Sequence, residues 1–76
     1  MNMREYIEYQ ISALNDLIRI NKDRITGYRQ RMATTPDDDL EELIGSVAAE
    51  ANHEPNRRRQ RKLDAAFDAL NEAASG

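Results

Sequence analysis

Residues 7–32 read IEYQISALNDLIRINKDRITGYRQRM, and apolar side chains recur along this stretch every three or four positions. The recurring positions are Ile7, Ile11, Leu14, Ile18, Asn21, Ile25, Tyr28 and Met32. This spacing predicts one long amphipathic helix with a coiled-coil type of seam. Asn2 and Glu5 form a capping-box pattern at its start. Asn21 is the polar position of the seam, where an amide usually fixes register and partner number.

Two shorter helices are expected after residue 32. The run TTPDDD, residues 34–39, has the composition of a helix stop followed by a new start. A second helix begins at Thr35, and Pro55 ends or kinks it, because proline inside a helix costs about 3 kcal/mol. Beyond Pro55, the apolar residues Leu63, Phe67 and Leu70 are out of phase with the preceding helix. We therefore predict an all-α bundle with a long first helix packed against two shorter helices, or against one helix kinked near Pro55.

Composition restricts the protein class. The 76 residues include no cysteine, which excludes disulfides and thiolate metal sites and fits a reducing compartment. The first ten residues carry three charges and no continuous apolar block, so we expect no signal peptide and no membrane partner. The sequence thus predicts one helical-bundle domain, residues 1–76, with a cytoplasmic location.

Charge is strongly segmented along the chain. Residues 33–54 carry seven acidic and no basic side chains, whereas the segments before and after them each have a net charge of +2. The acidic middle segment is expected to lie against the two basic segments, in the same chain or in a second copy.

Helix lengths favour self-association. The first helix would be roughly 45 Å long, against roughly 25 Å and 30 Å for the other two. Either path of the shorter helices leaves large apolar side chains bare, and a second copy is the simplest cover. We expect a homodimer or higher homo-oligomer, with an interface formed by Met3, Tyr6, Ile7, Ile11, Leu14, Ile18 and Asn21.

Residues 14–32 resemble the opening helix of an uncharacterised bacterial family of ferritin-like four-helix-bundle domains. The resemblance is carried by Leu14, Asn15, Leu17, Ile18, Asp23, Gly27 and Tyr28. It implies a helical bundle and no established activity. The chain is shorter than a complete domain of that family and has Pro55 where a long helix would continue. A match over one helix followed by a departure is also compatible with an engineered relative.

Glu50 and His53 have the Glu-x-x-His spacing with which ferritin-like helices bind metal ions, so a di-iron site formed by paired copies is the alternative function. A helical wheel places both side chains sideways or outward, and the first helix offers no inward acid. We therefore expect no metal and no cofactor, with Glu50 and His53 as the candidates if a metal does bind.

The basic run is the only candidate for nucleic-acid binding, and it consists of Arg57, Arg58, Arg59, Arg61 and Lys62. Nucleic acid is the less favoured partner, because the chain as a whole is acidic and no aromatic residue interrupts the run to stack on bases. One histidine, no cysteine and no glycine-rich loop leave no catalytic residues to name. The sequence predicts a self-associating, structural helical module that is not an enzyme.

Overall fold

The computed structural model describes residues 1–18 and 20–75, and this part of the chain contains helices and turns but no strand. It has four α-helices, which are α1 Met3–Ala13, α2 Lys22–Thr34, α3 Leu40–Ala48 and α4 Arg57–Ser75. A π-helical turn, Leu14–Ile18, extends α1, and 3-10 turns precede and follow α3 at Asp37–Asp39 and Ala49–His53. The predicted all-α fold class is confirmed.

The prediction of one long first helix is wrong, because the chain turns back near Asn21. Asn21 has an extended backbone, and its side-chain oxygen accepts a hydrogen bond from the Asp23 N–H at 2.7 Å. It therefore caps α2 from outside the helix and is exposed, whereas the seam pattern placed it inside an interface. Asparagine is one of the preferred residues at the N-cap of a helix. The negative charge of Asp23 is favourable close to the positively polarised N-terminus of α2. The apparent seam is thus two apolar faces, one on each side of a bend.

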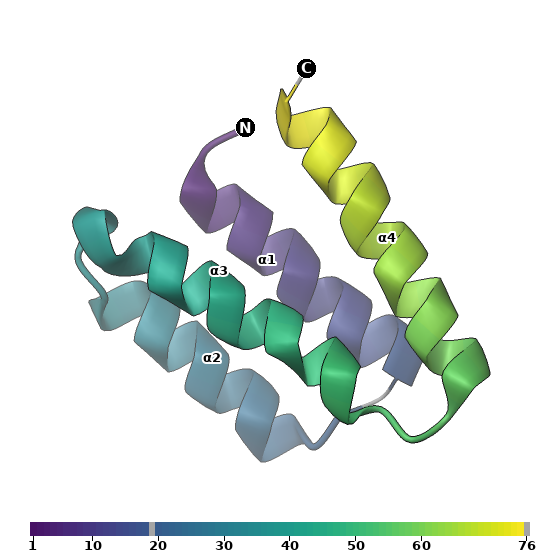
Figure 1. Ribbon diagram of the computed structural model, residues 1–76. Coiled ribbons are helices and arrows are strands. Elements are labelled where there is room, and N and C mark those ends of the chain that lie inside the picture. The colour runs from purple at the N-terminus through teal and green to yellow at the C-terminus, as the bar shows by residue number, and fades with distance from the viewer. Residues whose placement is uncertain (19, 76) are drawn as a thin grey trace.

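The helices form a small bundle around α1 (Figure 1). α1 packs against each of α2, α3 and α4. α2 and α4 run opposite to α1, and α3 runs in the same direction. The break before α4 is where the sequence placed it: Glu54 is extended, as the residue before a proline prefers, and Asn56 accepts a hydrogen bond from the Arg59 N–H. α4 folds back along α1, so the kinked-rod alternative does not apply.

One hydrophobic core receives side chains from all four helices. Its buried members are Ile7, Ile11, Leu14, Ile18, Ile25, Leu40, Leu43, Val47, Ala51, Leu63 and Phe67. Four of the expected interface residues, Ile7, Ile11, Leu14 and Ile18, therefore lie inside the single chain. The length argument failed for them because the turn near Asn21 makes the first helix shorter than expected, and α2, α3 and α4 all pack against it.

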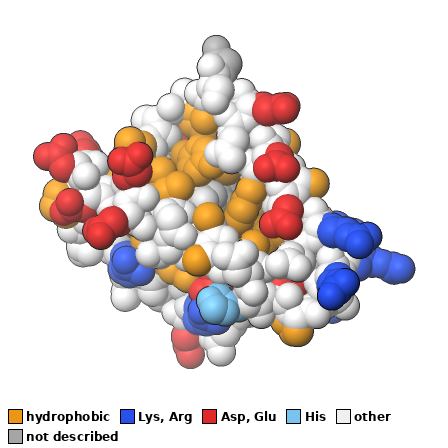
Figure 2. Space-filling model, in the orientation of Figure 1, with side chains coloured by type: hydrophobic (Ala, Val, Ile, Leu, Met, Phe, Trp, Pro, Cys, Tyr) orange, Lys and Arg blue, Asp and Glu red, His pale blue; other side chains and the backbone are white. Residues whose placement is uncertain are grey.

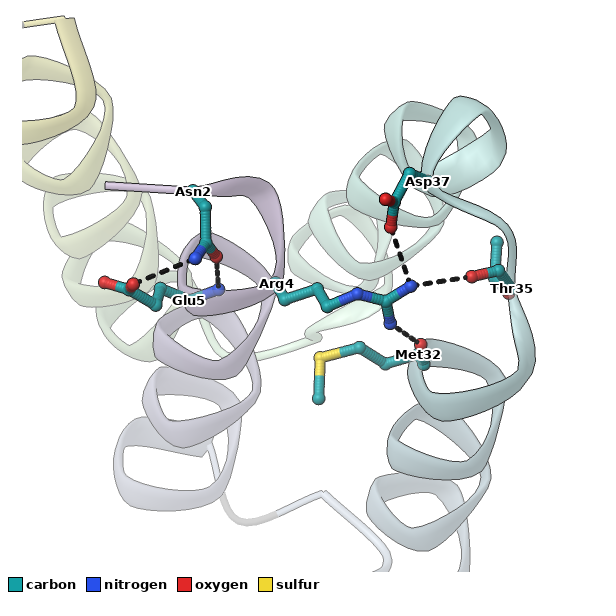
Figure 3. A network of polar contacts seen from close by, with 6 residues as sticks. All are labelled: Asn2, Arg4, Glu5, Met32, Thr35 and Asp37. Carbon is teal, nitrogen blue, oxygen red and sulfur yellow. Dashed lines mark hydrogen bonds and ion pairs between the residues drawn. The ribbon is translucent and has the colours of Figure 1, made fainter.

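Arg4 fastens α1 to the turn between α2 and α3 (Figure 3). Its guanidinium donates to the carbonyl oxygens of Met32 and Thr35, the latter at 3.0 Å, and to Oδ1 of Asp37 at 2.9 Å. The last carbonyls of a helix have no partner within the helix, so Arg4 satisfies groups that α2 leaves free. Beside it, Asn2 caps α1 by accepting from the Glu5 N–H at 2.8 Å, as the capping-box pattern predicted.

Candidate functional site

Among the described residues, the buried charged group is the carboxylate of Glu50, in the 3-10 turn after α3. Its side chain is 6% exposed, and Oε1 accepts hydrogen bonds from the guanidinium of Arg24 and the hydroxyl of Tyr28. Arg24 and Tyr28 stand four residues apart on α2, so both project from one face of that helix. The three side chains, called here the Glu50 cluster, join α2 to the end of α3.

The expectation that Glu50 projects sideways or outward is therefore wrong, because its side chain is buried, whereas His53 is exposed as expected. The wheel assumed α-helical winding through residue 53, but the chain tightens to 3-10 winding at Ala49, which has fewer residues per turn and changes the direction of the following side chains. The helical wheel also took no account of α2, which the sequence did not separate from α1. Burial of a carboxylate requires partners, and Arg24 and Tyr28 supply them.

The Glu50 cluster borders a shallow hollow of about 180 Å³, which is also lined by His53 and Glu54. Glu50, His53 and Glu54 are residue types that can bind a metal ion, and they line the same hollow. Across residues 1–18 and 20–75, however, no three His, Asp or Glu side chains are placed so that they could hold a metal ion. The carboxylate of Glu50 is turned toward a guanidinium and a hydroxyl, so its geometry is that of a structural ion pair.

Burial raises the pKa of Tyr28 above its ordinary value of 10.0, and the hydrogen bond to Glu50 and the negative charge of that carboxylate raise it further. Arg24 acts in the opposite direction but does not reverse the shift. Tyr28 is thus held as a neutral hydrogen-bond donor, which suits a structural role and does not suit a base.

The acidic side chains at the α2–α3 turn and the basic side chains at the start of α4 lie in different parts of the surface. Figure 2 shows acidic side chains gathered where α2 turns into α3 and basic side chains gathered at the start of α4, on opposite sides of the view. Two of the ion pairs join the first segment to the acidic middle segment as expected: Arg4 with Asp37, and Arg24 with Glu50. The basic run is different. Its five members are exposed, and none has an ion-pair partner among the described residues.

An apolar groove of about 430 Å³ runs between α1 and α4. Its lining is entirely hydrophobic: Met1, Tyr9, Ala13, Ala66, Phe67, Ala69, Leu70 and Ala73. Met1 and Tyr9 are 55% and 57% exposed. Of the predicted interface residues, Met3 is also exposed and Tyr6 is half-buried, with its hydroxyl bonded to Asn71 of α4.

Sequence reasoning missed Arg24, Tyr28 and Arg4 as partners in the structure. The spacing of Arg24 and Tyr28 was a usable signal, because a cation and a hydroxyl four residues apart can serve one acceptor. Arg4 gave no local signal, since its acceptors lie 28 to 33 residues away.

No helix among the described residues has the length and apolar character needed to cross a membrane. In comparisons with protein-family models, with curated proteins and with solved structures, nothing matches this chain. The functional argument therefore rests on the geometry of the chain itself.

Proposed function

We propose that the protein is a self-associating helical module with a structural role and without catalytic activity. The observation that carries this proposal is the apolar groove between α1 and α4. Met1, Tyr9 and Ala69 of this groove are exposed, and grouped apolar side chains of this kind offer a place for another protein surface to bind. Apart from Met1, the groove residues belong to α1 and α4, so a partner would bury side chains of both helices.

The polar groups support the same proposal. The buried carboxylate of Glu50 pairs with the Arg24 guanidinium and accepts a hydrogen bond from Tyr28, and His53 is exposed. Catalysis needs a nucleophile or base held free in a pocket, and the Glu50 cluster has its groups engaged with one another. The alternative of a di-iron site formed by paired copies has weaker support for the same reason.

Light scattering after size exclusion at tens of micromolar tests the proposal. We expect a mass of at least two chains of 8.7 kDa. Ala69→Glu, in the groove, should lower that mass to one chain without loss of helix content by circular dichroism. Ala33→Glu is the matched control, because Ala33 is an exposed helical alanine outside the groove lining. A monodisperse 8.7 kDa wild-type protein contradicts the proposal.

A further inference from the structure

One side of α4 carries a row of charged side chains whose sign reverses half-way along the helix. The row, called here the α4 charge row, consists of Arg57, Arg61, Asp68 and Glu72, and all four side chains are exposed. Their spacings of four, seven and four residues confine them to an arc of about 60° on a helix with 3.6 residues per turn. Figure 2 shows the basic side chains gathered at the start of α4 and acidic side chains along its later turns.

The α4 charge row lies on a surface of its own. Leu63 and Phe67, which anchor α4 in the core, stand about 130° around the helix from the centre of the row. The groove residues Ala66, Ala69 and Ala73 stand about 120° from it on the other side. No member of the row has an ion pair among the described residues. The row is therefore separate from both the core and the apolar groove.

The charges of α4 are arranged unfavourably for a helix on its own. Arg57 and Arg61 are four residues apart, so the two cations repel each other, and Asp68 and Glu72 repel each other in the same way. The arginines also stand in the first turns of α4, where the positive end of the helix dipole disfavours cations. A neighbouring helix with the opposite order of charges would relieve both effects.

We propose that α4 of a second copy lies antiparallel along the α4 charge row, related by a two-fold axis through the midpoint of the row. Arg61 then faces Asp68 of the second copy, and Arg57 faces Glu72 of the second copy. The two members of each pair are equally far from the midpoint, so the axis forms each contact twice. Ala65, exposed beside the axis, is small enough for the helices to approach closely. This contact goes beyond the groove-mediated self-association proposed above, because it uses a different side of α4.

Charge complementarity selects this arrangement over its rivals. A parallel pair of α4 helices would place Arg61 against Arg61 and Asp68 against Asp68, and like charges in contact disfavour it. A nucleic acid would match the basic half of the row and would be repelled by the acidic half. Asp64, at the border of the row, follows Arg61 by three residues, a spacing at which opposite charges attract within one helix. The antiparallel second copy matches both halves of the row.

Charge reversal tests the pairing. The dissociation constant is measured by sedimentation at low salt, with Ala69→Glu in every variant to remove the groove contact. Arg61→Glu and Asp68→Lys each turn two opposite-charge contacts into like-charge contacts, and we expect about tenfold weaker association. The double variant Arg61→Glu/Asp68→Lys should recover the starting value, because residues 61 and 68 of different copies again carry opposite charges. Lys62→Glu is the matched control, since Lys62 is exposed on α4 outside the row, and it should change nothing.

Cysteine cross-linking tests the orientation. The chain has no cysteine of its own, so a single introduced cysteine reports on its own copy in the second chain. Ala65→Cys, beside the axis, should form a disulfide-linked dimer under mild oxidation. Ser75→Cys is the matched control, since Ser75 is exposed on the same side of α4. The antiparallel arrangement separates its two copies by roughly 30 Å, so it should not cross-link.

Four results would overturn the proposal. They are an Ala69→Glu protein that stays monomeric at low salt, single reversals that leave the dissociation constant unchanged, a double variant that does not recover, and Ser75→Cys cross-linking as fast as Ala65→Cys. If Arg61→Glu abolishes micromolar binding of a DNA oligonucleotide without weakening self-association, the arginines serve a polyanion and the proposal is likewise overturned. Association that persists at roughly 0.5 M salt and is lost in Ala69→Glu belongs to the groove, so the two contacts are judged independently.

Discussion

α2 and α4 both flank α1 and run opposite to it, yet they are held in different ways. α2 buries one large apolar side chain, Ile25, and is tied to its neighbours by polar contacts. These are the Glu50 cluster, the Arg4 contacts at its end, and the ion pair of Arg29 with Glu8 at 3.1 Å. α4 buries Leu63 and Phe67, makes one side-chain hydrogen bond to α1, and has no ion pair to the other described helices.

The difference indicates which kind of contact stabilises each helix and which helix keeps an uncovered surface. Apolar burial contributes more per side chain than a partly exposed polar contact, so α4 can be anchored by few residues. Those anchors occupy one narrow face of α4 and leave its flanks open, including the flank along the groove. Two charged side chains of α2, Arg24 and Arg29, form ion pairs with other elements, whereas no charged side chain of α4 does so among the described residues.

The largest effect should come from the anchor of α4. Leu63 is fully buried, and Leu63→Ala should lower the free energy of unfolding by about 3 kcal/mol through lost burial and a cavity. Urea denaturation measures this loss. Leu70→Ala, at a half-buried position of the same helix, should cost clearly less. Equal losses for the two variants would mean that α4 has no dominant anchor.

The polar attachment of α2 should be weaker. Glu50→Ala removes the acceptor shared by Arg24 and Tyr28, and we expect a loss of about 1 to 2 kcal/mol, because both donors can partly turn to water. Glu42→Ala is the control, as Glu42 is exposed on α3 and should change stability little. A loss as large as that of Leu63→Ala would remove the contrast between the two helices.

The Glu50 cluster should also give a stability that depends on pH. Tyr28 has a folded-state pKa above the unfolded value of 10.0, so the folded protein retains this proton to higher pH than the unfolded chain does. Its contribution is complete below pH 10 and is lost as the pH rises through the folded-state pKa. Tyr28→Phe should cost about 1 kcal/mol at neutral pH and flatten this alkaline decline. An unchanged decline in the variant would assign it to other groups.

The smallest effect, and a favourable one, is expected in the interior of α2. A Cβ added at Gly27 meets no atom within 4 Å, so Gly27→Ala should raise the free energy of unfolding by about 0.5 to 1 kcal/mol through helix propensity. Gly45→Ala in α3 has the same open surroundings and provides a comparison. A loss at position 27 alone would show that α2 depends on a close approach there.

The all-α class, the capped start of α1 and the break near Pro55 could be predicted because each depends on residues close together in the sequence. The bend near Asn21 could not be predicted. The apolar residues along residues 7–32 alternate four and three apart, and this spacing fits one long helix as well as two facing helices joined by a turn. Asparagine serves as a seam residue or as a cap, and only the tertiary packing decides between them. Glu50 was misplaced for a related reason: its partners are on α2, a helix that the sequence did not separate from α1.

The contacts of Arg4 have a consequence for the order of folding events. They connect positions 28 to 33 residues apart, and closing a loop of that size costs chain entropy before the hydrogen bonds are gained. Those bonds should therefore form after the transition state, once the apolar faces of α1 and α2 have met. Arg4→Ala should then accelerate unfolding and leave the refolding rate nearly unchanged, so that Arg4 sets the lifetime of the native state more than the speed of reaching it.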